Sequence, residues 1–407
     1  MVGHIGTTEL AAASFAINLF HVGMLFGLGI TLGITPLVGQ SLNSQKSNYA
    51  GSWLRNGILV NFIASLLLCA VMSSVVLFMN RMGQRDDVVQ KAIPFYLLQV
   101  ASLIPMMLFF SFKQFLEGIG NTRIAMVITI IINLVNIVLN YVLIYGKYGF
   151  PELGLNGSGY ASLISRLIMP VIFIAVMLKR PAFRVYLIDA FHSGFEKLKI
   201  KRIISIGLPI GMQMVIEILA FTLGAIMLGW ISKESLAGHQ VAISMAGMTY
   251  MISFGLASGT TIRVSHAFGE HHLKEIKQTV YASLHMVVAF MSLMGILFVL
   301  LRNQLPLLFT SDPAVIQVAA ELLIVGAFFQ VFDGIQVVLL GALRGIADVR
   351  IPMLMAFFSY IAVSLPISYL FAFVFNFGYS GVWIGFVFGL STAAVLFAFR
   401  LRTQLKG

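Results

Sequence analysis

The chain alternates between long apolar segments and short polar ones. Eleven of the apolar segments are long enough to cross a bilayer, because a spanning helix needs about 20 mainly apolar residues. They lie near 10–38, 56–78, 93–116, 125–145, 157–178, 207–231, 236–262, 280–301, 315–343, 352–374 and 381–399. The pattern therefore predicts an all-α polytopic membrane protein with about eleven spanning helices.

The second half of the chain resembles the first. Several stretches align in order: Glu9-Leu-Ala-Ala with Ser235-Leu-Ala-Gly, Gly29, Gly33, Thr35 and Val38 with Gly255, Gly259, Thr261 and Val264, Gly118-Ile-Gly-Asn with Gly345-Ile-Ala-Asp, and Gly154, Gly157 and Ala161 with Gly378, Gly381 and Gly385. Each pair falls at the same rank in its half and on the same side of the membrane. Such a parallel repeat predicts two pseudo-symmetric helix bundles.

The two predicted domains differ by one helix. Residues 1–190 hold five spans and residues 191–407 hold six, and the span without a counterpart is 207–231. One further span ahead of Met1 restores the duplication, so we expect a twelve-span plan whose first helix is missing from this sequence. An eleven-span protein is the alternative.

Composition supports a membrane protein and sets its orientation. The chain is 59% hydrophobic and 10% charged, whereas soluble domains are about a quarter charged. Its net charge of +11 comes mainly from loops on one side of the predicted spans. This side receives Lys179, Arg180, Arg184, Lys197, Lys199, Lys201, Arg202, Arg344 and Arg350, among others. The positive-inside rule makes it cytoplasmic, which predicts an inner (plasma) membrane protein with a cytoplasmic C-terminus. A nucleic-acid partner is not expected, because the charges do not form a soluble basic face.

Two acids lie inside apolar segments of the second half. Glu217 is near the middle of 207–231, and Asp333 lies inside 315–343. An ionisable group near the centre of a spanning helix costs on the order of 3 kcal/mol or more, so by default it marks a function. Because we count no Lys or Arg inside the spans of this half, the pair predicts a negative site that binds a cation. A purely structural role between helices is the alternative.

Amide side chains accompany the acids. Gln213 lies one turn before Glu217, and Gln330 and Gln336 flank Asp333 at one-turn spacing. Polar groups inside apolar helices should face one another or a water-filled cavity. In the first half, Asn136 and Asn140 share one helix face, and hydrogen bonds between helices explain them as well as cavity lining does.

Motifs of other protein classes are absent from the sequence. It contains no Gly-x-x-x-x-Gly-Lys-Ser/Thr phosphate loop, no His-Glu-x-x-His and no Gly-x-Ser-x-Gly. His266, His271 and His272 share a loop, but without a carboxylate or cysteine at fixed ligand spacing they do not predict a metal site. His239 on an apolar helix is interpreted as a hydrogen-bonded structural group. The chain is therefore interpreted as a transporter and not as an enzyme.

The quoted stretches together carry a resemblance. Met1-Val-Gly-His-Ile-Gly, Gly207-Leu-Pro-Ile-Gly, Leu236-Ala-Gly-His-Gln-Val-Ala and Leu343-Arg-Gly-Ile-Ala-Asp resemble the multidrug and toxic compound extrusion (MATE) family, most closely its NorM branch. The resemblance covers the whole chain. It implies two six-helix lobes and a secondary antiporter that exports cationic or amphipathic compounds in exchange for Na+ or H+, with no other cofactor.

The resemblance also implies roles for single residues. Glu217 and Asp333 match the acids of the seventh and tenth helices, and Tyr250 matches a cation-site tyrosine of the eighth. Asn136 and Asn140 match asparagines that line the N-lobe. The departure is at the front, because the first helix of the family, with its own acid, corresponds to sequence ahead of Met1.

Two alternatives to an antiporter stay open at this stage. A lipid-linked saccharide flippase of related architecture should have extra spans and a basic central cavity, of which only Arg166 is a sign. An intramembrane enzyme is less well supported, because no nucleophile and base or metal cluster stands out. The expected partners of the antiporter are small cationic or amphipathic molecules and membrane lipid, and the protein is expected to be a monomer.

Overall fold

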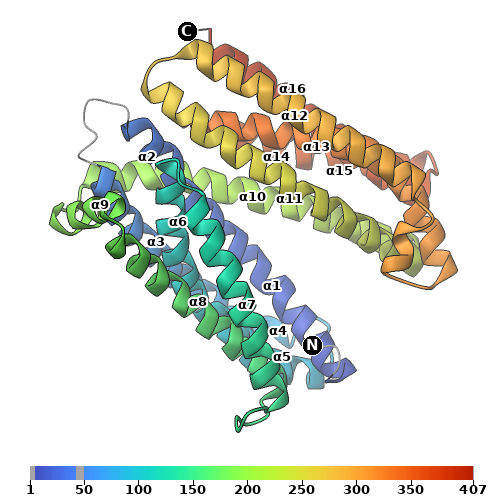
Figure 1. The fold of residues 1–407 in the computed structure, drawn as a ribbon. Helices are drawn as coiled ribbons and strands as arrows, with labels where there is room; N and C mark the ends of the chain where they lie inside the picture. The colour runs from blue at the N-terminus through green and yellow to red at the C-terminus, as the bar shows by residue number, and fades with distance from the viewer. Residues whose placement is uncertain (1–4, 43–49, 407) are drawn as a thin grey trace. The chain divides into compact units, whose positions relative to one another are not determined.

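The structure is a computed structural model that describes residues 5–42 and 50–406, and in these ranges it contains helices and short connections but no β-strand (Figure 1). Within these described ranges, eleven helical segments are long and apolar enough to cross a membrane. They are Thr7–Leu42, Ala50–Met79, Asp86–Gly118, Arg123–Tyr145, Gly154–Lys179, Lys197–Ile231, Lys233–Gly269, Leu273–Leu300, Pro313–Gly345, Arg350–Val374 and Gly378–Gln404. Each contains one of the predicted apolar segments or nearly all of it, so the predicted fold class is confirmed.

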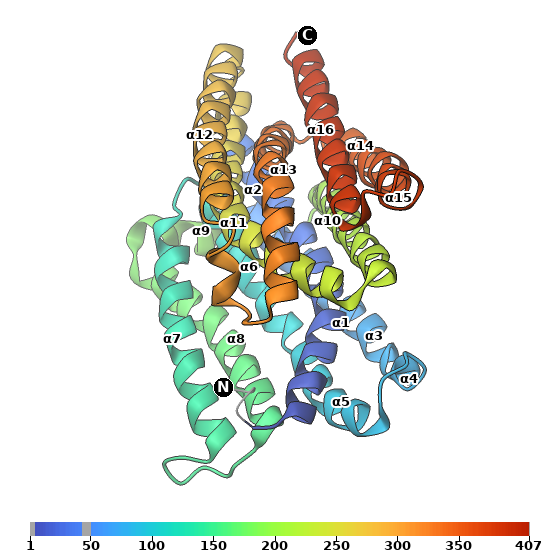
Figure 2. The same ribbon diagram turned by 90° about the vertical axis from the view of Figure 1, so that its right-hand side faces the viewer.

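The first compact unit, Met1–Gly211, contains nine helices among its described residues and the first turns of a tenth. The nine are α1 (Thr7–Leu32), α2 (Ile34–Leu42), α3 (Ala50–Ser74), α4 (Val76–Met79), α5 (Asp86–Ala101), α6 (Leu103–Gly118), α7 (Arg123–Tyr145), α8 (Gly154–Lys179) and α9 (Pro181–His192). In this unit α7 runs beside α8, and α1 runs beside α5 (Figures 1 and 2).

Glycines explain why the start of α10 (Lys197–Ile231) belongs to the first unit. A Cβ atom on Gly29 would lie 2.5 Å from the backbone nitrogen of Gly211, and one on Gly33 would lie 2.8 Å from that of Gly207. The two helices therefore touch backbone to backbone, which only glycine permits. The first compact unit thus extends into α10 as far as Gly211. The predicted division of the chain between residues 190 and 191 stays a prediction.

The second compact unit, Met212–Gly407, is built around α13. It holds the remainder of α10 and then α11 (Lys233–Gly269), α12 (Leu273–Leu300), η3 (Leu305–Leu308), α13 (Pro313–Gly345), α14 (Arg350–Phe357), η4 (Phe358–Ser364), α15 (Leu365–Tyr369), η5 (Leu370–Val374) and α16 (Gly378–Gln404). Helices α11, α12 and α16 all pack against α13 (Figure 2). Two of the segments, η4 and η5, are π-helical, so the tenth span, Arg350–Val374, is irregular.

The internal duplication is visible in the packing. A Cβ atom on Gly118 at the end of α6 would lie 2.8 Å from Cβ of Val38, and a Cβ atom on Gly345 at the end of α13 would lie 2.8 Å from Cβ of Val264. In both units the same added atom would lie 3.0 Å from the carbonyl oxygen of the threonine three residues before that valine. These are the residues that the sequence repeat pairs, so each lobe uses the same close helix contact.

This contact makes a prediction about stability. We expect Gly345→Ala to lower the midpoint of thermal unfolding in detergent, at a cost of about 1–3 kcal/mol, because the new methyl group overlaps Val264. Gly118→Ala should do the same through Val38. The matched control is Gly255→Ala on α11, where a Cβ atom would meet nothing within 4 Å. An unchanged midpoint for both contact variants would contradict this packing.

The basic stretch after the fifth span is more ordered than its composition indicates. The sequence pattern treats 179–203 as a loop, but residues Pro181–His192 form α9. Pro181 occupies the first helical position, where the missing N–H group costs nothing. With 12 residues, α9 is too short to cross a bilayer, so a search for bilayer-length apolar segments does not find it.

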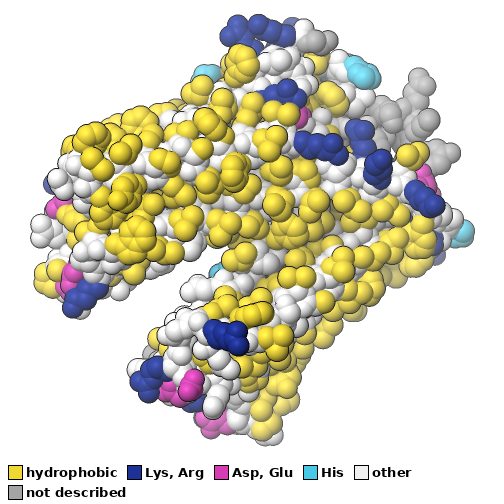
Figure 3. Space-filling model, turned by 180° about the vertical axis from the view of Figure 1, so that it is seen from behind, with side chains coloured by type: hydrophobic (Ala, Val, Ile, Leu, Met, Phe, Trp, Pro, Cys, Tyr) yellow, Lys and Arg dark blue, Asp and Glu magenta, His cyan; other side chains and the backbone are white. Residues whose placement is uncertain are grey.

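The surface fits a bilayer. On the face in Figure 3, hydrophobic side chains cover the flanks of the helices, and Lys, Arg, Asp and Glu gather mainly at helix ends. Large apolar side chains such as Leu67, Leu134 and Val171 are more than half exposed in the middle of their helices. Exposed apolar surface on this scale is unfavourable in water and matches lipid contact.

Candidate functional site

The second unit brings the two predicted acids together. Glu217 projects from α10 and is partly exposed, and Asp333 projects from α13 and is only 5% exposed. The two carboxylates lie close enough for their charges to interact. One carboxylate of the pair is therefore partly accessible, and the other is buried.

A buried arginine joins this pair. Arg344 Nη2 donates to Gln213 Oε1 at 2.6 Å, and Gln213 Nε2 donates to Glu217 Oε2 at 3.2 Å. The side chain of Arg344 is 7% exposed, so the expectation that this half has no internal Lys or Arg is wrong. The reason is that α13 continues to Gly345, and Arg344 in its last turn points into the unit and not into the following loop.

The charges of this cluster do not balance. With both carboxylates ionised and Arg344 protonated, two negative charges face one positive charge, which leaves one net negative charge. Buried charges are costly unless they are paired. A single monovalent cation, either a proton or a metal ion, is therefore enough to neutralise the cluster.

The predicted glutamines are part of the same interior. Gln336 Nε2 donates to Asp333 Oδ1 at 3.2 Å, and Gln330 Oε1 accepts a hydrogen bond from the hydroxyl of Thr249 on α11. Both glutamines are at most 1% exposed. The remaining amide atoms, Gln336 Oε1 and Gln330 Nε2, have no partner among the described residues. The group thus offers polar atoms beyond those that its own hydrogen bonds use.

Two tyrosines complete the cluster. Tyr250 of α11 and Tyr360 of the π-helical segment η4 lie close enough to Glu217 and Asp333 for electrostatic interaction. Tyr360 is 2% exposed and its hydroxyl has no partner among the described residues. The resemblance pointed to Tyr250, but the sequence analysis missed Tyr360, because a tyrosine in an apolar segment gives no periodic signal. Carboxylate, amide and phenol oxygens together form a donor set that suits a small hard cation.

The asparagines predicted to line a cleft lie in the first unit. Asn136 Nδ2 donates to Ser165 Oγ at 3.2 Å and so connects α7 with α8, and Asn140 Nδ2 donates to Asn136 Oδ1 at 3.0 Å. Both side chains are partly exposed. The interhelical hydrogen bond that the sequence left as one option is therefore present, and cavity lining stays a prediction.

The first unit has a partly buried arginine of its own. Arg166 of α8 donates to Gln99 Oε1 at 3.0 Å and to the hydroxyl of Ser102, and its guanidinium lies 5.1 Å from the ring centre of Phe20. Ser102 is the residue at which α5 ends and α6 begins. These contacts tie Arg166 to neighbouring helices, so it gives little support to a basic flippase cavity.

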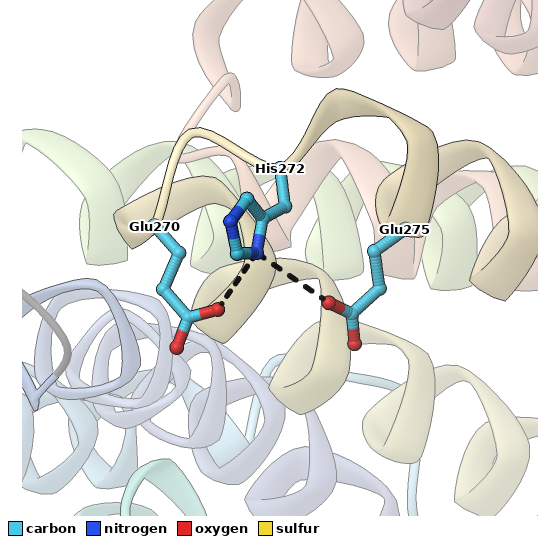
Figure 4. A group of neighbouring side chains, drawn as sticks. All are labelled: Glu270, His272 and Glu275. Atoms are coloured by element: carbon cyan, nitrogen blue, oxygen red, sulfur yellow. Dashed lines mark ion pairs between the residues drawn. The ribbon is translucent and has the colours of Figure 1, made fainter.

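One cluster of possible metal ligands lies outside the acid site. At the turn between α11 and α12, His272 Nδ1 lies 3.0 Å from Glu270 Oε2 and 3.9 Å from Glu275 Oε2 (Figure 4). Sequence spacing did not predict this grouping, which arises because the tight turn folds Glu270 back. Arg263 Nη2 also approaches Glu275, at 3.8 Å. We interpret the group as solvent-exposed ion pairs that fasten the turn.

The isolated histidine of α11 is structural, as the sequence analysis predicted. His239 is 3% exposed, and its Nδ1 accepts a hydrogen bond from Trp383 Nε1 at 3.1 Å. It sits in an aromatic group with Phe386, whose ring centre is 6.3 Å away. This hydrogen bond explains the polar residue inside an apolar helix.

Comparison with known proteins places this architecture in a family. The sequence model of the MatE family matches residues 1–142 and 209–370, one match in each half of the chain. The chain belongs to the MatE family. The double match agrees with the internal duplication, and the second one contains the acids, the glutamines and Arg344.

Similar proteins span nearly the whole chain. Multidrug resistance protein NorM of Photobacterium profundum is 32% identical over 99% of this chain and 89% of its own length. Probable multidrug resistance protein NorM of Agrobacterium fabrum is 31% identical over 100% and 88%. Both relatives are named as multidrug resistance proteins, and neither name describes an enzyme.

Solved structures share the fold at lower identity. A MOP superfamily transporter from Pyrococcus furiosus superposes with a TM-score of 0.90 at 18% identity and covers 100% of this chain and 90% of its own. A mutant of the Vibrio cholerae MATE transporter VcmN superposes with a TM-score of 0.89 at 16% identity, with the same coverage. These likenesses confirm the two-lobe MATE fold that the repeat predicted.

Proposed function

We propose that this chain is a secondary antiporter that exports cationic or amphipathic small molecules in exchange for Na+ or H+. The relatives named as multidrug resistance proteins support the substrate class. The observation that carries the mechanism is the uncompensated negative charge of Glu217, Asp333 and Arg344 inside one lobe. The relatives do not favour the flippase alternative.

In this mechanism the acid cluster is the coupling site. The partly exposed Glu217 receives the ion, and the buried Asp333 holds it. Gln213 donates a hydrogen bond to the Glu217 carboxylate and so positions it. Gln213 also accepts a hydrogen bond from Arg344, and through this residue the charge state of Glu217 affects Arg344. When a cation occupies the cluster, the lobe loses its net negative charge and its attraction for a cationic substrate falls. Such a coupling free energy between two ligands is what exchange requires.

We propose that the protein lies in the inner membrane with its C-terminus in the cytoplasm. The support is the excess of Lys and Arg in the loops of that side, which the positive-inside rule assigns to the cytoplasm. In this orientation export follows an inward gradient of Na+ or protons. The protein is proposed to act as a monomer, since each chain carries one complete acid cluster.

Transport in proteoliposomes tests this function. Purified protein is reconstituted into vesicles, and the movement of a fluorescent organic cation is followed under a Na+ gradient, under a pH gradient and with no gradient. We expect at least one gradient to accelerate transport about tenfold relative to the vesicles without one. Equal rates in all three conditions would rule out ion-coupled exchange of this substrate class.

A further inference from the structure

A groove near the end of the second unit is separate from the acid cluster. It lies between α12, α13 and α16, which run side by side in Figure 2. Its volume is about 530 Å³. Its wall is mainly apolar and includes Leu284, Leu339 and Ala398, and its mouth carries Lys277, Arg402 and Lys406.

The groove has an apolar part and a basic part. Lys277 lies in the second turn of α12, and Arg402 and Lys406 lie at the end of α16. Leu284 is seven residues further along α12 than Lys277, which is roughly 10 Å deeper at the rise of an α-helix. The three cations therefore lie at one end of the apolar groove.

The cations of this groove have no partner within the described part of the chain. All three side chains are exposed, none of them makes a hydrogen bond or an ion pair with a described residue, and no Asp or Glu lines the groove. Three like charges around one opening repel one another. An anion is therefore the complementary ligand at the mouth.

The first unit contains the equivalent groove, which differs in the number of its cations. Phe112 lies six residues before Gly118, as Leu339 does before Gly345, and both residues line grooves in their units. The groove of the first unit measures about 560 Å³ and carries one cation, Arg55. The duplication thus builds this groove twice.

The cation of the first groove is already satisfied by the chain. Arg55 Nη1 donates to the carbonyl oxygens of Ala190 at 3.2 Å and Phe191 at 2.8 Å in the last turn of α9. Its guanidinium also lies 4.3 Å from the ring centre of Phe195. In the first groove, acceptors from the protein itself therefore pair with the cation. In the second groove, an external anion can take this role.

We propose that the groove between α12, α13 and α16 binds an anionic glycerophospholipid. One acyl chain lies against Leu339 and Ala398, and the phosphate group is held by Lys277, Arg402 and Lys406. An anionic lipid combines the two parts that the groove requires, a hydrocarbon chain and a negative head group at the membrane edge. A zwitterionic lipid has no net charge to match three cations, so it binds less well.

Native mass spectrometry of the purified full chain tests this site. Phosphatidylglycerol and phosphatidylcholine with identical acyl chains are added at equal concentration, and the bound lipid is counted for each variant. The head-group variant is Lys277→Gln with Arg402→Gln and Lys406→Gln, and the chain variant is Ala398→Trp, which fills the groove from an exposed position and keeps the charges. The control removes three exposed cations of the first unit through Lys197→Gln, Lys201→Gln and Arg202→Gln.

We expect the wild-type protein to retain phosphatidylglycerol over phosphatidylcholine by about fivefold or more, a preference that basic clusters at a membrane surface give. Both groove variants should lose this preference, and the control triple should keep it. Three results would each overturn the proposal: equal retention of the two lipids by the wild type, an unchanged preference in Ala398→Trp, or an equal loss in the control triple. The last result would mean that any basic patch of this charge suffices.

Discussion

Replacing Asp333 by Asn is expected to reduce gradient-driven transport by about tenfold or more, which is the size of a typical coupling free energy between two ligands. The substitution keeps the shape of a side chain that is 5% exposed and removes its negative charge. With Arg344 unchanged, the charge of the cluster rises from minus one to zero. A neutral cluster no longer attracts a cation, so an ion gradient can no longer drive transport through it. Transport in proteoliposomes under the effective gradient measures the loss.

The same experiment has a matched control on the same helix. Glu321 of α13 is a partly exposed carboxylate whose Oε2 accepts a hydrogen bond from the hydroxyl of Tyr379 at 2.5 Å, away from the acid cluster. Glu321→Gln should transport at close to the wild-type rate. Glu217→Gln should behave like Asp333→Asn, because it removes the other negative charge. Wild-type coupling in both cluster variants would show that the acids are only structural.

Replacing Arg344 by Gln is expected to destabilise the second unit by about 3–5 kcal/mol, the cost of leaving a buried charge without its partner. The guanidinium holds Gln213 through a 2.6 Å hydrogen bond, and its removal leaves two carboxylates with no internal cation. The midpoint of thermal unfolding in detergent should fall accordingly. Arg350→Gln, at an exposed position one helix later, is the control and should leave the midpoint unchanged.

A second substitution shows whether the stability loss of Arg344→Gln comes from unpaired charge or from lost packing. If the loss comes from unpaired negative charge, adding Glu217→Gln to Arg344→Gln should recover about 1–2 kcal/mol of stability, a coupling typical of residues in one network. The double variant should still fail to couple transport to a gradient. Strictly additive losses in the two single variants would mean that Arg344 stabilises the unit without acting on Glu217.

The spans and the acids could be predicted because each has a local signal. Bilayer-length apolar runs identify helices without any knowledge of tertiary contacts, and a carboxylate such as Asp333 inside such a run is conspicuous. The glycine pairs of the repeat, such as Gly118 and Gly345, likewise stand out in the sequence. The structure shows that their missing side chains allow close contacts between helices.

The residues that were missed depend on where a side chain points. Arg344 stands at the end of an apolar run, where the sequence cannot distinguish a loop residue from one that folds back to Gln213. Helix α9 was missed for a different reason, because its 12 residues are too few for a bilayer-length apolar run. Tyr360 joins the acids through an irregular π-helical segment, whose spacing no periodic pattern predicts. Hydropathy predicts which segments lie in the membrane. It does not predict the direction in which a side chain points within the helix bundle.

The most direct test of the central claim is a count of the ions that the acid cluster binds. Equilibrium binding of radioactive Na+ to the purified protein is measured in weakly buffered solution, and proton uptake or release is recorded in the same sample. The charges of Glu217, Asp333 and Arg344 predict one monovalent cation per chain, either Na+ or a proton, and the loss of this binding in the double variant Glu217→Gln with Asp333→Asn. Wild-type stoichiometry in that double variant would contradict the account.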